Sequence, residues 1–145
     1  MCKDEKDIKS YLDKSLLQKE KQERFPLLIY KKENKQLAGT TSFYNISFSN
    51  KTICIGYTII SPHFQRTGIN QECKKMMLDW CFGEMEFERV EFRVDKKNEK
   101  SVLSLKRLGA VEEGTLRSEV LTVGGGRRDT VILSILKNEW KSKKI

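Results

Sequence analysis

Apolar residues at helical spacing mark three segments of the chain. The first is an otherwise polar stretch, residues 4–24, and we expect its helix to end at Pro26 or just before it. Its apolar positions are Ile8, Tyr11, Leu12, Leu16 and Leu17. The second stripe, in residues 69–83, consists of Ile69, Cys73, Met76, Met77 and Trp80. A third helix is predicted between Asn98, which suits an N-cap, and Gly109, which suits the C′ position.

Strand patterns fill most of the remaining chain. The clearest is the strict alternation of Val90, Phe92 and Val94 with charged residues, which is typical of a half-buried strand. Runs rich in β-branched and aromatic residues predict further strands at 27–30, 37–44, 53–60, 110–123 and 130–136. The first two of these make a hairpin. The glycine-rich stretch 124–128 is expected to be a hairpin tip, and 138–144 a basic tail.

The predicted elements follow one another as a helix, a β meander and then β–α–β–α–β–β. Helices that follow central strands indicate an α/β (α+β) protein, with a mixed sheet and helices packed on its faces. The chain has 145 residues, no internal repeat and no linker. We therefore expect one domain over residues 1–145.

Composition narrows the class of protein. A charged fraction of 33% beside 38% hydrophobic residues is typical of a globular chain and excludes a disordered one. No apolar run reaches the roughly 20 residues that span a membrane, and the first residues lack a secretory apolar core, so we expect a cytoplasmic protein without membrane contact. The net charge of +8 would suit an anionic cofactor, acidic substrates or nucleic acid. Nucleic acid is disfavoured, because no aromatic platform accompanies the basic residues.

The cysteines do not have the spacing of a metal site. Cys2, Cys54, Cys73 and Cys81 include no CxxC pair, and the chain has a single histidine, so no metal site is predicted. Three of the four fall in apolar periodic segments and are expected to be buried free thiols. Cys2 is expected to be a mobile terminal residue.

Chemistry is expected in residues 53–80, where a strand, a short loop and a helix follow one another. Pro62 ends the strand, Gly68 permits a positive φ or a close backbone approach, and Arg66 adds positive charge. The start of a helix aims several N–H groups at one point and favours an anion, usually a phosphate. The loop alone leaves an alternative open, in which this is an ordinary turn and Gly68 only relieves crowding.

The stretch IGYTIISPHFQRTGINQECKKMML resembles the central motif of the GNAT superfamily, the acetyl-CoA-dependent N-acetyltransferases. The family pattern is Gln/Arg-x-x-Gly-x-Gly/Ala after a strand. Gln65, Gly68 and Asn70 occupy its fixed positions, although Asn70 departs from the small final residue. The segments VEFRVDKKNEKSVLSLKRLGAVEEGTLR and RRDTVILSILKNEW look like the RimJ/RimL-like branch, which acetylates ribosomal-protein N-termini.

The resemblance implies a fold and a cosubstrate. The fold is a mixed, mostly antiparallel, twisted sheet with a splayed central strand pair and helices on both faces, and the cosubstrate is acetyl-CoA. In the family, the backbone at the end of the central strand bonds the pantetheine arm, and the helix start cradles the pyrophosphate. The cofactor-binding residues it implies are Ile60, Gln65, Arg66, Thr67, Gly68, Ile69, Asn70, Asn98 and Ser101. For the last two, capping of the helix is the simpler explanation.

The implied reaction is direct transfer of an acetyl group to an amine, which needs an acid for the leaving thiolate. The tyrosine that often supplies this proton in the superfamily is replaced here by Leu105, which cannot donate. Ser101 is the catalytic candidate, and Ser104 is a second one, both by position only. Candidate bases for the amine are Glu72, Glu91 and Glu112. His63 is expected to be a surface loop residue.

Proteins of this branch usually begin with a strand and a helix before the segment that matches here at Asp4. The domain is therefore expected to be N-terminally shortened, with an exposed sheet edge that favours a homodimer. The expected acceptor is a small amine or a protein N-terminus, and the basic surface would suit an acidic protein. Two alternatives stay open: a noncatalytic remnant that binds acetyl-CoA or CoA, and a basic protein associated with ribosomes or nucleic acid.

Overall fold

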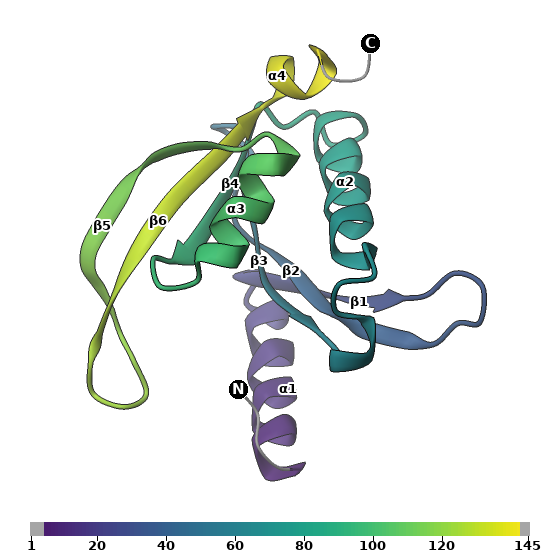
Figure 1. Ribbon diagram of the computed structural model, residues 1–145, viewed down its shortest axis with the longest axis vertical. Coiled ribbons are helices and arrows are strands. Elements are labelled where there is room, and N and C mark those ends of the chain that lie inside the picture. Colours follow the sequence, from purple (N-terminus) through teal and green to yellow (C-terminus); the bar gives the residue numbers. More distant parts are fainter. Residues whose placement is uncertain (1–4, 143–145) are drawn as a thin grey trace.

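A computed structural model describes residues 5–142, with side chains from residue 9 onwards (Figure 1). Cys2 and residues 143–144 of the expected basic tail lie outside these residues, and the expectation for the Ile8 side chain lies outside the described side chains. The helices are α1 (Glu5–Glu20), the short 3-10 helix η1 (Pro62–Phe64), α2 (Ile69–Phe82), α3 (Glu99–Leu108) and α4 (Lys137–Ser142). The strands are β1 (Arg24–Tyr30), β2 (Leu37–Ser47), β3 (Thr52–Ile60), β4 (Arg89–Asp95), β5 (Val111–Leu121) and β6 (Arg127–Leu136).

Six strands form one mixed sheet in the order β1-β2-β3-β4-β6-β5. Every neighbouring pair is antiparallel except β3 and β4, which run parallel. That pair is joined over three residue pairs only, from Thr52↔Arg89 to Cys54↔Glu91. Beyond Cys54 and Glu91 the two strands separate, so the sheet is splayed at its centre. The predicted fold class is confirmed.

One face of the sheet carries the main core. The predicted alternation in β4 is confirmed, since Val90, Phe92 and Val94 are buried while their neighbours are partly exposed. They share a cluster with residues of β6, α2 and α3, so these two helices cover this face (Figure 1). Each buried aromatic or branched side chain in such a cluster contributes about 1.5–3 kcal/mol of transfer free energy.

Helix α1 lies on the opposite face. The register places Arg24 beside Tyr44 and Tyr44 beside Cys54, on the side away from the buried β4 residues. Tyr11 of α1 accepts a hydrogen bond from Arg24 at 2.5 Å, which joins α1 to this side of the sheet. The rest of the expected α1 stripe is not covered, because Leu12, Leu16 and Leu17 are about half exposed.

The predicted stripe on α2 is partly wrong. Met76 is 72% exposed and Trp80 is 43% exposed. The buried positions are Lys74, Met77, Leu78, Cys81 and Phe82. These positions recur at helical spacing, but one of them is a lysine. A prediction based on hydropathy does not place a lysine on the buried face, so the predicted stripe is rotated around the helix axis from the observed one. Trp80 still contacts Phe43, with ring centroids 5.4 Å apart.

The elements before and after the sheet also differ from the prediction. The prediction of a basic tail is wrong for residues 138–142, because these residues belong to helix α4. That helix is held by Trp140, which is buried and donates to Asp79 Oδ1 at 2.7 Å. At the other end, α1 stops at Glu20, before Pro26, and β1 already includes Pro26. A proline is tolerated there because β1 is an edge strand.

Within the described residues, β1 has β2 on one side and no strand on the other. Leu28 and Tyr30 are about half exposed along it. The expected open edge is thus present, and the homodimer stays a prediction. None of the described helices is long and apolar enough to cross a membrane.

Candidate functional site

The loop between β3 and α2 has the conformation that an anion site needs. Gly68 is the N-cap of α2 with φ at 89°, a left-handed conformation in which glycine is favoured. A Cβ built at Gly68 would meet no atom within 4 Å. The glycine therefore serves the backbone conformation and leaves open space, which argues against the interpretation that it only relieves crowding. Among the described residues no side chain caps this helix, which leaves the N–H groups of its first turn available to a ligand.

Short contacts within the chain hold the loop in place. Strand β3 ends at Ile60, before Pro62, as predicted. The helix η1 that follows was not predicted, and its Phe64 is buried against Ile29 and Ala38. The hydroxyl of Thr67 donates to the Phe64 carbonyl at 2.6 Å. Phe64 thus anchors the loop to the apolar cluster, while Arg66 and Gly68 of the same loop line the cavity.

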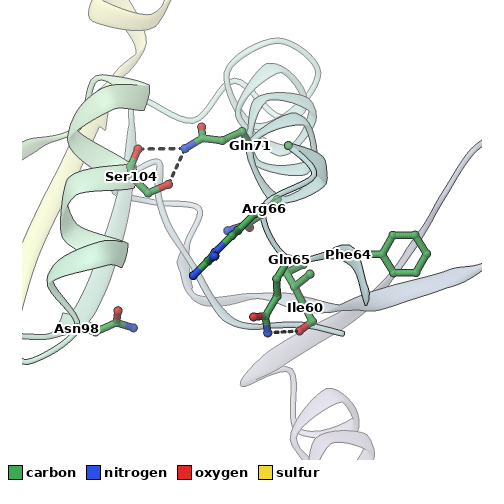
Figure 2. Close-up of a pocket in the computed structure, with 9 residues that line it drawn as sticks. Ile60, Phe64, Gln65, Arg66, Gln71, Asn98 and Ser104 are labelled. Atoms are coloured by element: carbon green, nitrogen blue, oxygen red, sulfur yellow. Dashed lines mark hydrogen bonds between the residues drawn. The ribbon is translucent and has the colours of Figure 1, made fainter. Parts of the chain in front are cut away.

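A cavity of about 460 Å³ opens beside this loop, between the start of α2 and helix α3 (Figure 2). It lies on the side where β3 and β4 have separated. Its lining residues are Ile60, Phe64, Gln65, Arg66, Gly68, Asn70, Gln71, Asn98 and Ser104. In Figure 2, Arg66 extends towards α3, and Asn98 faces the loop from the other side of the space.

Most of the predicted cofactor-binding residues are brought together by this cavity. Those that line it are Ile60, Gln65, Arg66, Gly68, Asn70 and Asn98. Thr67, Ile69 and Ser101 do not line it. Thr67 bonds within the loop, Ile69 packs against the Phe64 cluster, and the Ser101 N–H donates to Asn98 Oδ1 at 3.2 Å. The predicted N-cap at Asn98 is therefore confirmed.

The carbonyl of Ile60 has a partner within the chain. Gln65 Nε2 donates to it at 3.2 Å, and Figure 2 shows this bond between the two lining residues. A pantetheine amide that bonded the same oxygen would have to share it with Gln65 or displace it. Gln65, the glutamine at a fixed position of the motif, thus bonds the last residue of β3 in this structure.

The sequence analysis missed three lining residues as cofactor contacts: Phe64, Gln71 and Ser104. Gln71 joins the two helices, because its Nε2 donates to the Ser104 hydroxyl at 2.5 Å and to the Ser104 carbonyl at 3.2 Å. Since that hydroxyl accepts from Gln71, its own proton is free to point elsewhere. Of these three, only Ser104 could be proposed from the sequence, because of its position on α3. The bond between Gln71 and Ser104 joins residues 33 apart in sequence, so no local pattern indicates it.

The proton-transfer candidates differ in their surroundings. Leu105 is buried in the core, as expected for a side chain that cannot donate. Glu72 is exposed, and Glu112 is paired with Lys106 at 2.7 Å. Glu91 accepts from Arg89 and Arg93 at 2.8 and 3.2 Å. His63 is exposed in η1, which confirms the surface assignment.

A polar row crosses the other face of the sheet at the base of the splay. Strand register aligns one residue from each of five strands: Arg24, Tyr44, Cys54, Glu91 and Ser134. Burial raises the pKa of Tyr44 well above its usual range and raises the pKa of the Cys54 thiol to about 11. Both groups stay neutral at physiological pH, so Cys54 offers no thiolate nucleophile.

The other cysteines behave in the same way. Burial raises the pKa of the Cys81 thiol to about 12 and also raises that of Cys73. All three are free thiols, as expected; burial is confirmed for Cys54 and Cys81, whereas Cys73 is only partly buried. Within residues 5–142, no three His, Cys, Asp or Glu side chains are grouped as a metal site would require.

Comparison with known proteins identifies the family. The sequence profile of the acetyltransferase (GNAT) domain matches residues 2–111. The chain belongs to the GNAT acetyltransferase family. YdaF of Bacillus subtilis (strain 168), which carries the name of a ribosomal N-acetyltransferase, is 35% identical over 108 residues, covering 74% of this chain and 58% of YdaF. This GNAT chain thus spans less than two thirds of that relative's length.

Two further relatives define the range of similarity. The spermidine N(1)-acetyltransferase of Escherichia coli (strain K12) is 29% identical over 82 residues, which cover 57% of this chain and 44% of that enzyme. A crystal structure described as an acetyltransferase from T. thermophilus matches with a TM-score of 0.86 and 32% identity, over 97% of this chain and 72% of the other. The fold is thus shared well beyond the motif.

The GNAT family implies acetyl-CoA as acyl donor, and the cavity has the chemistry to accept it. The open space at Gly68 leaves room for a phosphate at the helix start. The Arg66 side chain adds a cation that can pair with a phosphate. Asn98 supplies a neutral amide on the far wall, suited to a polar uncharged arm.

Proposed function

We propose that this chain is an N-acetyltransferase domain that moves an acetyl group from acetyl-CoA directly to an amine. The observation that carries the proposal is the cavity between the uncapped start of α2 and helix α3. It combines the N–H groups of a helix start, a cation and polar amides in one space. The parent family uses such a donor.

The cavity residues divide between the two ends of the donor. The N–H groups of residues 66–70 and the Arg66 side chain would hold the diphosphate. The end of β3 at Ile60 and the Asn98 amide would contact the pantetheine arm. Acetyl-CoA, when bound, supplies the activated acetyl group. The protein's contribution is then to fix the donor's position and to exclude water from it.

Ser104 is the side chain best placed to assist the leaving thiolate. It lines the cavity, whereas Ser101 does not, and its hydroxyl proton is not used by Gln71. A serine hydroxyl is too weakly acidic to transfer its proton completely, so its role is a hydrogen bond to the developing negative charge. Leu105, the next residue, is buried in the core and offers no donor.

The proposed acceptor is an amine, either a protein N-terminus or a polyamine. The RimJ/RimL-like resemblance favours a protein N-terminus and agrees with the ribosomal N-acetyltransferase name of YdaF, whereas the E. coli relative is named for spermidine. The net charge of +8 favours an acidic protein over a polycation, because like charges repel. A RimJ/RimL-like specificity for a protein N-terminus is therefore our first choice.

A second candidate function is binding of acetyl-CoA without turnover. Leu105 favours it, because the position that often holds the proton donor in the superfamily is apolar here. The two functions share the cavity and differ only in whether free CoA is released.

Release of free thiol in the presence of acceptors separates these functions. Acidic N-terminal peptides and polyamines are incubated with acetyl-CoA, and free thiol is measured. Release above the rate without enzyme, greatest with an acidic peptide, is expected. Ser104→Ala should lower turnover about tenfold, the value of one hydrogen bond, and Ser101→Ala should leave it unchanged. Binding without release for every acceptor would contradict the enzymatic proposal and leave the binding module.

A further inference from the structure

Lys74 is a buried cation on the inner face of α2. Its residue is only 8% exposed, and it lies at helical spacing from the core residues Met77, Leu78 and Cys81. Burying an ammonium group away from water is costly unless the charge is compensated. Lys74 therefore requires an explanation that its apolar neighbours do not provide.

Its partner is a neutral amide. Lys74 Nζ donates to Asn70 Oδ1 at 2.6 Å, one turn nearer the start of α2. Among the described side chains, none of the carboxylates forms an ion pair with Lys74. Burial lowers the pKa of Lys74, as expected for a cation with no counterion.

The lysine determines how Asn70 is oriented. A lysine ammonium can only donate, so the amide oxygen must face Lys74 and the NH2 group must face elsewhere. Asn70 also lines the cavity, beside Gly68 and Arg66. The amide thus offers N–H donors, rather than an acceptor, at the place where the helix start already presents backbone N–H groups.

We propose that Lys74 is a positioning and affinity residue for the negatively charged part of the cofactor, acting through Asn70. The inference rests on the proposed acetyl-CoA site. The buried ammonium holds the Asn70 amide as a donor towards the cavity. It also places a positive charge behind the start of α2, in a medium where an arriving diphosphate is attracted more strongly than it would be in water. The bound anion is the counterion that the described residues lack.

The chain offers a matched pair of variants for the test. Lys74→Met replaces the buried cation with an apolar side chain of similar length, and Lys75→Met removes the same charge from the next, exposed position. Both change the net charge equally. Thermal unfolding without ligand and binding of acetyl-CoA by calorimetry are measured for the wild type and both variants. Binding of acetyl-pantetheine, which lacks the diphosphate, is measured by competition.

We expect Lys74→Met to unfold at the wild-type temperature or above it, because an uncompensated buried charge has been removed. Its affinity for acetyl-CoA should fall about tenfold, the effect of a charge-assisted contact, with no change for acetyl-pantetheine. Lys75→Met should match the wild type. Since Lys74 acts through Asn70, Asn70→Ala should lose a similar factor, and the double variant no more than the larger single loss.

Two results would overturn the inference alone. One is wild-type affinity for acetyl-CoA in Lys74→Met. The other is a variant that unfolds at a lower temperature and loses acetyl-pantetheine as strongly as acetyl-CoA, which would make Lys74 a structural residue. Failure of the wild type to bind acetyl-CoA is a different outcome, because it overturns the proposed function itself and the inference with it.

Discussion

Glu113 of β5 lies at the centre of a charged network that spans three neighbouring strands, β4, β6 and β5. Arg89 donates to both of its carboxylate oxygens, at 2.5 and 2.8 Å, and the Ser134 hydroxyl donates at 2.5 Å. These bonds, that from Arg89 above all, lower the pKa of Glu113 from 4.5 to about 2. A carboxylate whose pKa is lower in the folded state stabilises the fold only when it is ionised.

The predicted consequence is a pH-dependent contribution to stability. It should be complete above the ordinary pKa of 4.5 and disappear as the pH falls from there towards 2. Because the Glu113 side chain is 41% exposed, the contribution should stay below about 1 kcal/mol. Urea unfolding of Glu113→Gln and the wild type at neutral and acidic pH measures it. A difference that persisted unchanged into acid would contradict the assignment, and Glu23→Gln serves as an exposed control.

Single residues could be predicted where one local rule decides them. Gly109 has φ at 106° and ends α3, and Asn98 caps its start, both as their residue types indicate. Lys74 could not be predicted, because its burial depends on which side of α2 faces the sheet. Ser104 differs from Ser101 because it lines the cavity and bonds Gln71, a residue of another helix, and neither feature can be seen in the sequence.

At the scale of elements, Asn98 links the stability of α3 to the cavity. Its side chain accepts from the Ser101 N–H and its residue also lines the cavity. Asn98→Ala should therefore destabilise the protein by about 1 kcal/mol through loss of the cap and weaken acetyl-CoA binding as well.

Asn98→Ser separates the two roles. Serine also caps helices, so this variant should unfold within a few tenths of a kcal/mol of the wild type, while its shorter side chain loses the contact across the cavity. Thermal unfolding and calorimetric binding are compared for both variants. Wild-type affinity in Asn98→Ser would show that Asn98 is a cap and nothing more.

Elements with a strong internal pattern were predicted well. Strand β4 alternates strictly, and its three apolar residues are buried. Helix α4 was missed because six residues carry too little periodicity, and it is fixed by a bond from Trp140 to Asp79, 61 positions earlier in the chain. The extent of β1 was underestimated because Pro26 resembles a boundary, while its pairing with Ser42 places it inside an edge strand.

At the scale of the molecule, the separation of β3 and β4 organises both faces. The cavity opens towards the free ends of these strands, beneath α2 and α3, and the polar row crosses the opposite face where the strands still meet.

The most direct test of the account is a calorimetric titration of acetyl-CoA into three proteins. The wild type should bind with micromolar affinity. Gly68→Asn should lose most of that affinity, because asparagine tolerates a left-handed backbone but puts a side chain where the phosphate would lie. Gly114→Asn, at an equally open position on β5, should bind as the wild type does. Absence of heat at millimolar acetyl-CoA, or equal binding by all three proteins, would contradict a cofactor site at the start of α2.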